Sequence, residues 1–227
     1  MEFQIKNSPD YASLHVELNL GEQVVTESGA MMGMSTELEI SSNMKGGLFG
    51  AAKRMLGGES VFLNTYTAKS SRQRLDIAPA MPGDLKHMRL DGGAIKVQSG
   101  CFCASTVGVE LDTKWAGGKG FFGGTGLVML NCHGVGDLWL SSYGAIHEEQ
   151  VCGSFVLDTN HIVAFEDTLD FKVRKVGGLK SLFLSGEGLV CEFSGHGKLW
   201  YQTRSVDSLA SFLHPFRRVK PKSNNGS

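Results

Sequence analysis

The residues of this sequence best suited to metal chemistry are two closely spaced cysteines and several scattered histidines. Cys101 and Cys103 are two residues apart, so both thiols would lie on one face of an extended strand. A zinc site needs four protein ligands, or three and a water molecule, and no second close cysteine pair is present. We therefore interpret both thiols as core residues. The histidines weighed as further ligands are His87, His133, His147, His161 and His196.

Two of these histidines, His133 and His196, lie beside glycines, so we expect both in turns at the surface. His147 precedes two glutamates, but no second histidine completes the His-Glu-x-x-His zinc motif. We assign no residue to a metal site.

A glycine-rich run over residues 117–126 is superficially similar to a phosphate-binding loop. In such a loop the lysine is followed by Ser or Thr and opens a helix, whereas Lys119 is followed by Gly120 and then by a strand-like run. No Gly-x-Ser-x-Gly nucleophile motif is present, and Asp84 belongs to an ordinary Pro-Gly-Asp turn. We predict no catalytic residue and no cofactor, and expect a protein that is not an enzyme.

The composition is that of a globular protein with many turns. Of 227 residues, 41% are hydrophobic and 20% charged, and 30 glycines accompany only 5 prolines. The formal net charge of −1 disfavours nucleic-acid binding, because proteins that neutralise many phosphates carry a basic excess. Five scattered cysteines are typical of reduced thiols, and no signal peptide or membrane-spanning segment is recognised, so we expect a cytoplasmic protein.

The glycines belong to a pattern that occurs three times. A strand pair around a small turn comes first: Ser28-Gly29 matches Ser99-Gly100 at an offset of 71 residues, and residues 156–171 form a looser third copy. Each copy of this strand pair is followed by a Gly-Gly pair, then by an apolar stretch and a further strand. Copies two and three then share a closing strand, in which residues 134–139 match residues 195–200.

We expect an all-β protein in which one unit is triplicated. Runs rich in Val, Thr and aromatic residues lie between glycine-containing turns. Helix is predicted at residues 205–213, with Ser205 as N-cap, and a short candidate lies at residues 48–56. The expected organisation is a single β unit over residues 1–213 with repeats at about 1–90, 91–150 and 151–204, followed by a flexible basic tail at 214–227.

At these blocks the sequence resembles the family named for altered inheritance of mitochondria, over roughly residues 1–213. The resemblance rests on residues 46–66, on the Ala-Pro-Ala-Met-Pro-Gly-Asp-Leu run at 78–85 and on residues 99–104. It departs before Arg74, where copy one lacks the glycine pair of the other closing strands. The resemblance implies a fold similar to the tryptophan RNA-binding attenuation protein (TRAP-like), a short double-stranded β-helix or β-sandwich unit repeated with pseudo-threefold symmetry. It also implies assembly into rings, with a homotrimer favoured, but no agreed activity.

Each copy also carries a glycine-flanked apolar loop that could contact a partner. Filling of the core or of a subunit interface is one interpretation of these loops, and contact with a membrane surface or a partner protein is the other. The candidate interaction residues are Leu48, Phe49, Met55, Leu56, Phe121, Phe122, Leu182 and Phe183.

Two classes of function remain open at this point. The leading hypothesis is a non-enzymatic, self-assembling scaffold or interaction protein, because a triplicated unit is combined with no catalytic set. The alternative is a β protein that binds a small ligand or metal between its copies, or an assembly peripherally attached to membranes through the three loops.

Overall fold

A computed structural model describes residues 1–41, 63–112, 128–175 and 189–217 of the chain. The eight candidate interaction residues, the helix candidate at 48–56 and the glycine-rich run at 117–126 lie outside these described ranges.

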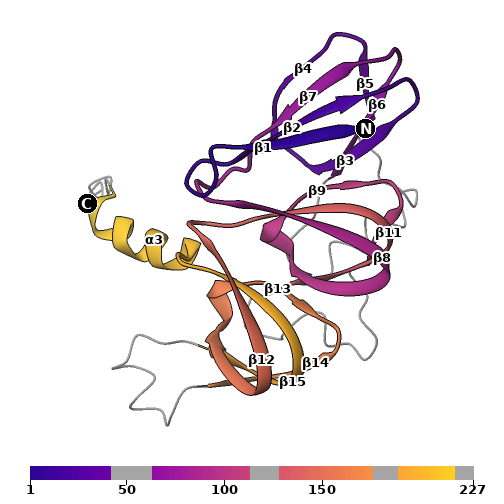
Figure 1. Cartoon of the computed structure of the whole chain (residues 1–227). Helices are drawn as coiled ribbons and strands as arrows, with labels where there is room; N and C mark the ends of the chain where they lie inside the picture. The colour runs from indigo at the N-terminus through magenta and orange to yellow at the C-terminus, as the bar shows by residue number, and fades with distance from the viewer. Residues whose placement is uncertain (42–62, 113–127, 176–188, 218–227) are drawn as a thin grey trace, which may run out of the picture.

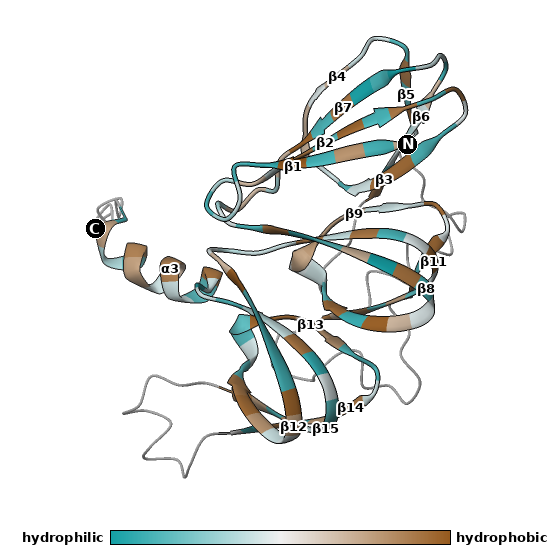
Figure 2. Ribbon diagram, viewed as in Figure 1, coloured by the Kyte–Doolittle hydropathy of each residue, from teal (hydrophilic) through white to brown (hydrophobic). Residues whose placement is uncertain are grey.

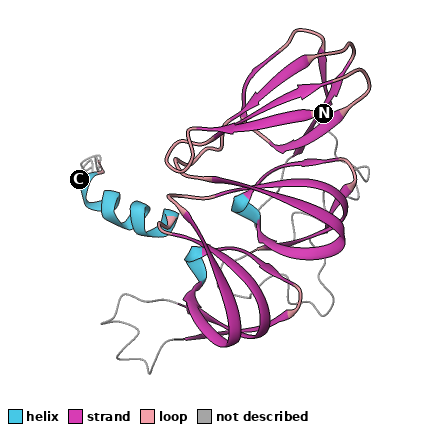
Figure 3. Ribbon diagram, in the orientation of Figure 1, coloured by secondary structure: helices cyan, strands magenta, loops and turns pink. Residues whose placement is uncertain are grey.

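The described chain is all-β, as predicted, and forms three β units in a row with a short helix beside them (Figures 1 and 3). The first unit contains β1 (Glu2–Lys6), β2 (Ser13–Leu18), β3 (Gln23–Glu27), β4 (Met31–Met34), β5 (Leu38–Ser41), β6 (Leu63–Ala68) and β7 (Gln73–Ile77). The second contains β8 (Leu85–Gln98), the 3-10 turn η2 (Ser99–Cys101), β9 (Phe102–Thr106), β10 (Val109–Asp112) and β11 (Met129–Ser141). The third contains β12 (Ile146–Asp158), η3 (Thr159–His161), β13 (Ile162–Glu166), β14 (Leu169–Lys175) and β15 (Leu189–Gln202).

Each of the last two units is built on one long, bent antiparallel hairpin, β8 with β11 and β12 with β15. In the first unit the same hairpin is cut into two pairs, β2 with β7 and β3 with β6. The cut falls where Gly21 and Arg72 adopt positive φ in tight turns. This accounts for the missing glycine pair before Arg74: the first unit turns where the others continue through a glycine bend.

The expectation that His133 and His196 lie in turns is wrong. His133 belongs to β11 and His196 to β15, because the neighbouring Gly134 and Gly195, with φ of 107° and 113°, bend these strands without ending them. At Gly134 the register shifts by one residue, which is a β-bulge, and a bulge redirects a strand while its pairing continues.

Neighbouring units are joined by backbone pairing between short strands and long ones. β9 of the second unit pairs with β3, placing Thr26 opposite Ala104. β13 of the third unit pairs with β8 in the same way, placing Val97 opposite Ala164. A continuous sheet therefore runs through all three units.

The apolar cores also cross the unit boundaries. Trp139 of the second unit is fully buried in the cluster that holds Leu14 and Leu75 of the first. Ala164 and Trp200 of the third unit belong to the cluster around Phe102. In strands such as β2 and β7, alternating apolar and polar residues direct one face into these cores (Figure 2). The three units therefore fold as one body.

The segments that connect the units lie side by side and hydrogen-bond to one another. Gly144 donates its N–H to the carbonyl of Pro82 at 3.0 Å, and Thr203 donates to the carbonyl of Ala145 at 3.1 Å. Gly83 and Gly144 form an isolated parallel bridge at this crossing. The chain passes between units at 78–84 and 142–145, so the expected repeat limits at 90 and 150 fall inside β8 and β12.

The predicted C-terminal helix is confirmed as α3 (Val206–Leu213), followed by the 3-10 turn η4 (His214–Phe216). Ser205 is its N-cap, as predicted, with its hydroxyl accepting from the N–H of Ser208 at 3.2 Å. In the described part of the chain, no helix has the length and apolar character needed to cross a membrane.

Replacing Gly83 by alanine should destabilise the fold strongly. A Cβ atom there would lie 2.8 Å from the backbone N and O of Gly144. The two linkers cannot move apart to make room without breaking the hydrogen bonds between them. We expect a loss of about 3 kcal/mol, typical of overpacking, measured by urea unfolding. Gly93→Ala is the control, because nothing lies within 4 Å of its Cβ position, and it should change stability by about 0.5 kcal/mol or less. Equal effects of the two variants would contradict the crossing as a rigid element.

Candidate functional site

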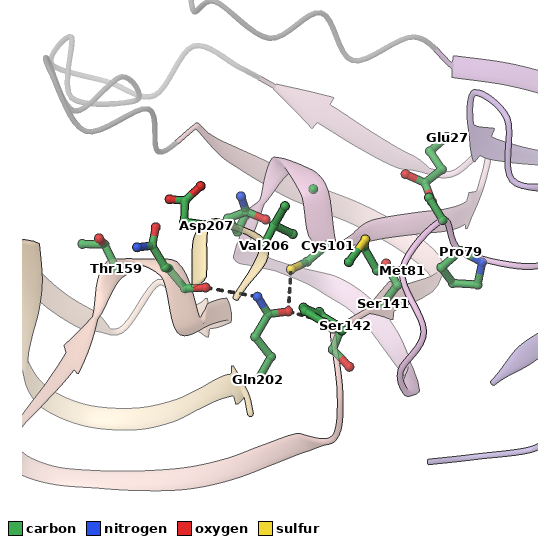
Figure 4. Close-up of a pocket in the computed structure, with 15 residues that line it drawn as sticks. Glu27, Pro79, Met81, Cys101, Ser141, Ser142, Thr159, Gln202, Val206 and Asp207 are labelled. Atoms are coloured by element: carbon green, nitrogen blue, oxygen red, sulfur yellow. Dashed lines mark hydrogen bonds between the residues drawn. The ribbon is translucent and has the colours of Figure 1, made fainter. Parts of the chain in front are cut away.

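A cavity of about 380 Å³ lies where the two linkers between units, residues 78–84 and 142–145, meet the 3-10 turns η2 and η3 and the start of α3. All three units contribute to its walls. Its lining residues are Glu27, Pro79, Ala80, Met81, Gln98, Gly100, Cys101, Ser141, Ser142, Tyr143, Thr159, Asn160, Gln202, Val206 and Asp207. Figure 4 shows Glu27 at one end of this group and Asp207 with Thr159 at the other, with Cys101 between them.

Glu27 is the most unusual ionisable group in the cavity. It ends β3, just before the tight turn at Gly29, whose φ is 88°. Burial raises the pKa of its carboxyl to about 7, and no hydrogen bond or ion pair from the described residues opposes that effect. An unpaired, half-buried carboxylate of this kind is a marker of functional sites.

The neighbouring thiol is chemically inert. Burial, with a smaller contribution from the charge of Glu27, raises the pKa of Cys101 to about 12. The thiol is therefore protonated at neutral pH and is no nucleophile.

The floor of the cavity is fixed by Gln202. Its Oε1 accepts from the backbone N–H of Tyr143 at 2.8 Å, and its Nε2 donates to the carbonyl of Asn160 at 3.1 Å. Cys101 Sγ lies 3.9 Å from the same Oε1. The side chain thus ties the second linker to η3, and these bonds hold the cavity open.

The cavity carries negative charge. Glu27 and Asp207 are the acidic residues of its lining, and the described lining residues include no Lys, Arg or His. A site of this kind favours cationic ligands.

The two cysteines considered for metal chemistry do not share a strand. Cys101 lies in η2 and Cys103 in β9, so the expectation of one strand face is wrong because the 3-10 turn rotates the chain between them. Both are buried, with exposed fractions of 3% and 0%, in agreement with their interpretation as core residues.

The histidines do not converge either. His87 contacts Asp137 at 2.9 Å and packs on Trp139, whereas His133 faces Asp112 at 3.2 Å. His161 bonds the carbonyl of Gln202 at 2.7 Å, and His147 stacks on Tyr201. Within the described ranges, no three His, Cys, Asp or Glu side chains gather as a metal-binding group.

The structure does assemble one Ser-His-Asp row that the sequence did not reveal. Ser13 Oγ lies 3.0 Å from His15 Nε2, and His15 Nδ1 lies 2.6 Å from Asp76 Oδ1. The order is that of a hydrolase triad, but Ser13 is only 6% exposed and Arg74 already binds Asp76. We interpret the row as a polar clamp between β2 and β7. Because side chains alternate along a strand, the sequence could have placed Ser13 and His15 on one face of β2. It could not show that β7, which carries Asp76, pairs with β2.

Glu27→Gln should stabilise the protein at alkaline pH. The folded-state pKa is raised from 4.5 to about 7, so the wild type loses stability as pH rises through this window. The neutral amide removes that loss, and we expect a gain of about 1–3 kcal/mol at pH 8 that vanishes near pH 4.5. Urea unfolding at both pH values measures it, with the exposed Glu110→Gln as control. A pH-independent difference would show that Glu27 is not destabilised by burial.

Comparison with known proteins agrees with the resemblance found in the sequence. The model of the family described as Mitochondrial biogenesis AIM24 matches residues 3–204. An uncharacterised protein of Streptococcus pyogenes serotype M6 is 28% identical over 99% of this chain and 93% of its own. A crystal structure of a Streptococcus pyogenes protein from a structural genomics consortium shares the fold, with a TM-score of 0.79, 23% identity, and coverage of 95% of this chain and 99% of that one. This chain belongs to the Mitochondrial biogenesis AIM24 family.

Proposed function

We propose that this protein is a non-enzymatic, self-assembling scaffold whose copies join head to tail through strands β4 and β12. The observation that carries the proposal is a joint used twice inside the chain, whose two halves find no partner strand in the described ranges at the ends of the row.

The internal joint has a constant form. In each case the strand that follows a tight turn pairs with the strand that precedes the equivalent turn of the preceding unit, as β9 does with β3 and β13 with β8. The joining strand also carries a bulge in the pairing that it makes inside its own unit. In the pairing of β9 with β11 the register shifts between Trp139 and Leu140, and in the pairing of β13 with β15 it shifts just before Ala164. β4 has the same bulge, between Met31 and Gly33, so it is built like the other joining strands.

The two halves without a partner are exposed and apolar. Of the described strands, only β7 pairs with β4, and Met31, Met32 and Met34 are 39%, 56% and 37% exposed. β9 and β13 are buried at all the corresponding positions from 102 to 105 and from 162 to 165. Similarly, β15 is the one described strand that pairs with β12, and Val156 near the end of β12 is 47% exposed. Exposed apolar edge strands recruit another strand.

The internal joints also give the register. Lys96 stands opposite Phe165, and Val25 stands opposite Ser105. By position in the repeat, the equivalent intermolecular pair is Val156 with Met34. Such a joint is heterologous, because different surfaces meet, and it closes into a ring or grows into a filament according to the rotation between copies.

We favour a closed homotrimer, with a TRAP-like arrangement of units, as the product of this joint. Five unpaired cysteines, four of them buried, suit the reducing cytoplasm, where we place the assembly. Nucleic acid is not an expected partner, because the net charge is −1. The three apolar loops around Phe49, Phe122 and Phe183 remain candidates for contact with a further partner protein or a membrane surface.

Single charges on each edge test the assembly. We expect the wild type to be an oligomer by light scattering at micromolar concentration, and Met34→Glu and Val156→Glu each to be monomers, because a charge on an edge strand opposes pairing. Leu20→Glu, in an exposed turn away from both edges, is the control and should assemble.

Mixing the two monomeric variants distinguishes a blocked joint from a misfolded chain. Each variant retains one intact half of the joint, so a one-to-one mixture of the two should give a heterodimer. The double variant has no intact half and should remain monomeric. A monomeric wild type, or assembly that survives both substitutions, would contradict the proposal.

A further inference from the structure

We propose that the cavity beside α3 binds a small organic cation, specifically an aliphatic diamine or polyamine that carries primary ammonium groups. This inference does not depend on assembly, because every residue that carries it belongs to one chain.

The first support is an uncompensated carboxylate. Glu27 faces the cavity without a partner among the described residues, and its burial raises its pKa to about 7. Keeping an unpaired acid in a half-buried position costs stability, whereas a bound ammonium group would supply the missing counter-charge and hydrogen bonds. The described lining offers no basic side chain for this purpose.

The second support is the balance of donors and acceptors. The hydroxyl of Ser142 donates to the carbonyl of Gly144 at 2.5 Å, and that of Thr159 donates to the carbonyl of Leu189 at 3.1 Å. The hydroxyl protons of Ser142 and Thr159 are thus committed within the protein, so these two hydroxyls can offer a ligand only their remaining lone pairs. The N–H groups of an ammonium ion are suitable partners for such lone pairs.

The third support is size and shape. At about 380 Å³ the cavity lies in the range of small-molecule sites. Apolar side chains of Pro79, Met81 and Val206 contribute to its wall and suit a methylene chain. Because Glu27 and Asp207 lie at opposite ends of the lining, an extended cation with an ammonium group at each end matches the charges (Figure 4).

Isothermal titration calorimetry of the full chain with 1,4-diaminobutane and with spermidine tests the proposal directly. We expect one amine per chain to bind the wild type at pH 8, and 1,4-butanediol and succinate to show no binding. Glu27→Gln should weaken amine binding at least about tenfold although it stabilises the fold, and Glu110→Gln should leave it unchanged. Because the first variant is expected to be more stable, its loss of binding could not come from unfolding.

The pH dependence provides a second readout. Among the described residues, the charge of Glu27 acts on the Cys101 and Cys103 thiols, which are kept neutral because burial raises the pKa of each, and Tyr143 and Asp207 lie elsewhere in the wall. Deprotonation of Glu27 near pH 7 should therefore control binding, with about tenfold weaker affinity at pH 6 than at pH 8. Binding of succinate in place of the amines, equal amine affinity of Glu27→Gln and the wild type, or no amine binding at all would each overturn the proposal.

Discussion

The structure depends on one repeated interaction, the antiparallel pairing of the strand after each turn with the strand before the equivalent turn of the preceding unit. The pairs of β9 with β3 and of β13 with β8 satisfy backbone groups that would otherwise lie on open sheet edges. They also bring the apolar faces of neighbouring units together, so that Trp139 is buried in the first unit's core. No unit has a complete core without its neighbour. Among the described residues, the same interaction leaves β4 and β12 without a further partner strand at the two ends of the row, and the proposed assembly follows from that imbalance.

The crossing of the linkers is the second consequence of this arrangement. Strand pairing sets the units at a constant spacing, so the connecting segments run past one another and bond through Pro82, Gly144 and Tyr143. Only a residue without a side chain fits at Gly83. The cavity forms at this crossing because the tight turns at the ends of β3, β8 and β12 approach the linkers there. Burial of the Glu27 carboxylate costs stability, and the proposed cation would offset that cost.

Much of the fold could be predicted from the sequence because the repeat marks equivalent backbone positions. The Ser-Gly turn and the N-cap at Ser205 have local physical causes, and the all-β class and the C-terminal helix are confirmed. The role of Gly134 was not predicted, because a glycine that bends a strand leaves the same pattern as one that ends it. Glu27 could not be identified as a site residue either. It is an ordinary glutamate at the end of a strand, and it is the approach of two distant linkers that leaves it half-buried and without a partner among the described residues.

The measurement that tests the central claim most directly is disulfide trapping across the proposed joint. A chain carrying Met34→Cys and Val156→Cys places the two thiols opposite each other only if β4 of one copy pairs with β12 of the next in the register of the internal joints. Under mild oxidation we expect covalently linked oligomers that dissociate on reduction, while Leu20→Cys with Val156→Cys, out of reach in that register, should remain single chains. Failure of the first pair to cross-link, with the protein folded and its thiols reactive, would contradict head-to-tail assembly through these strands.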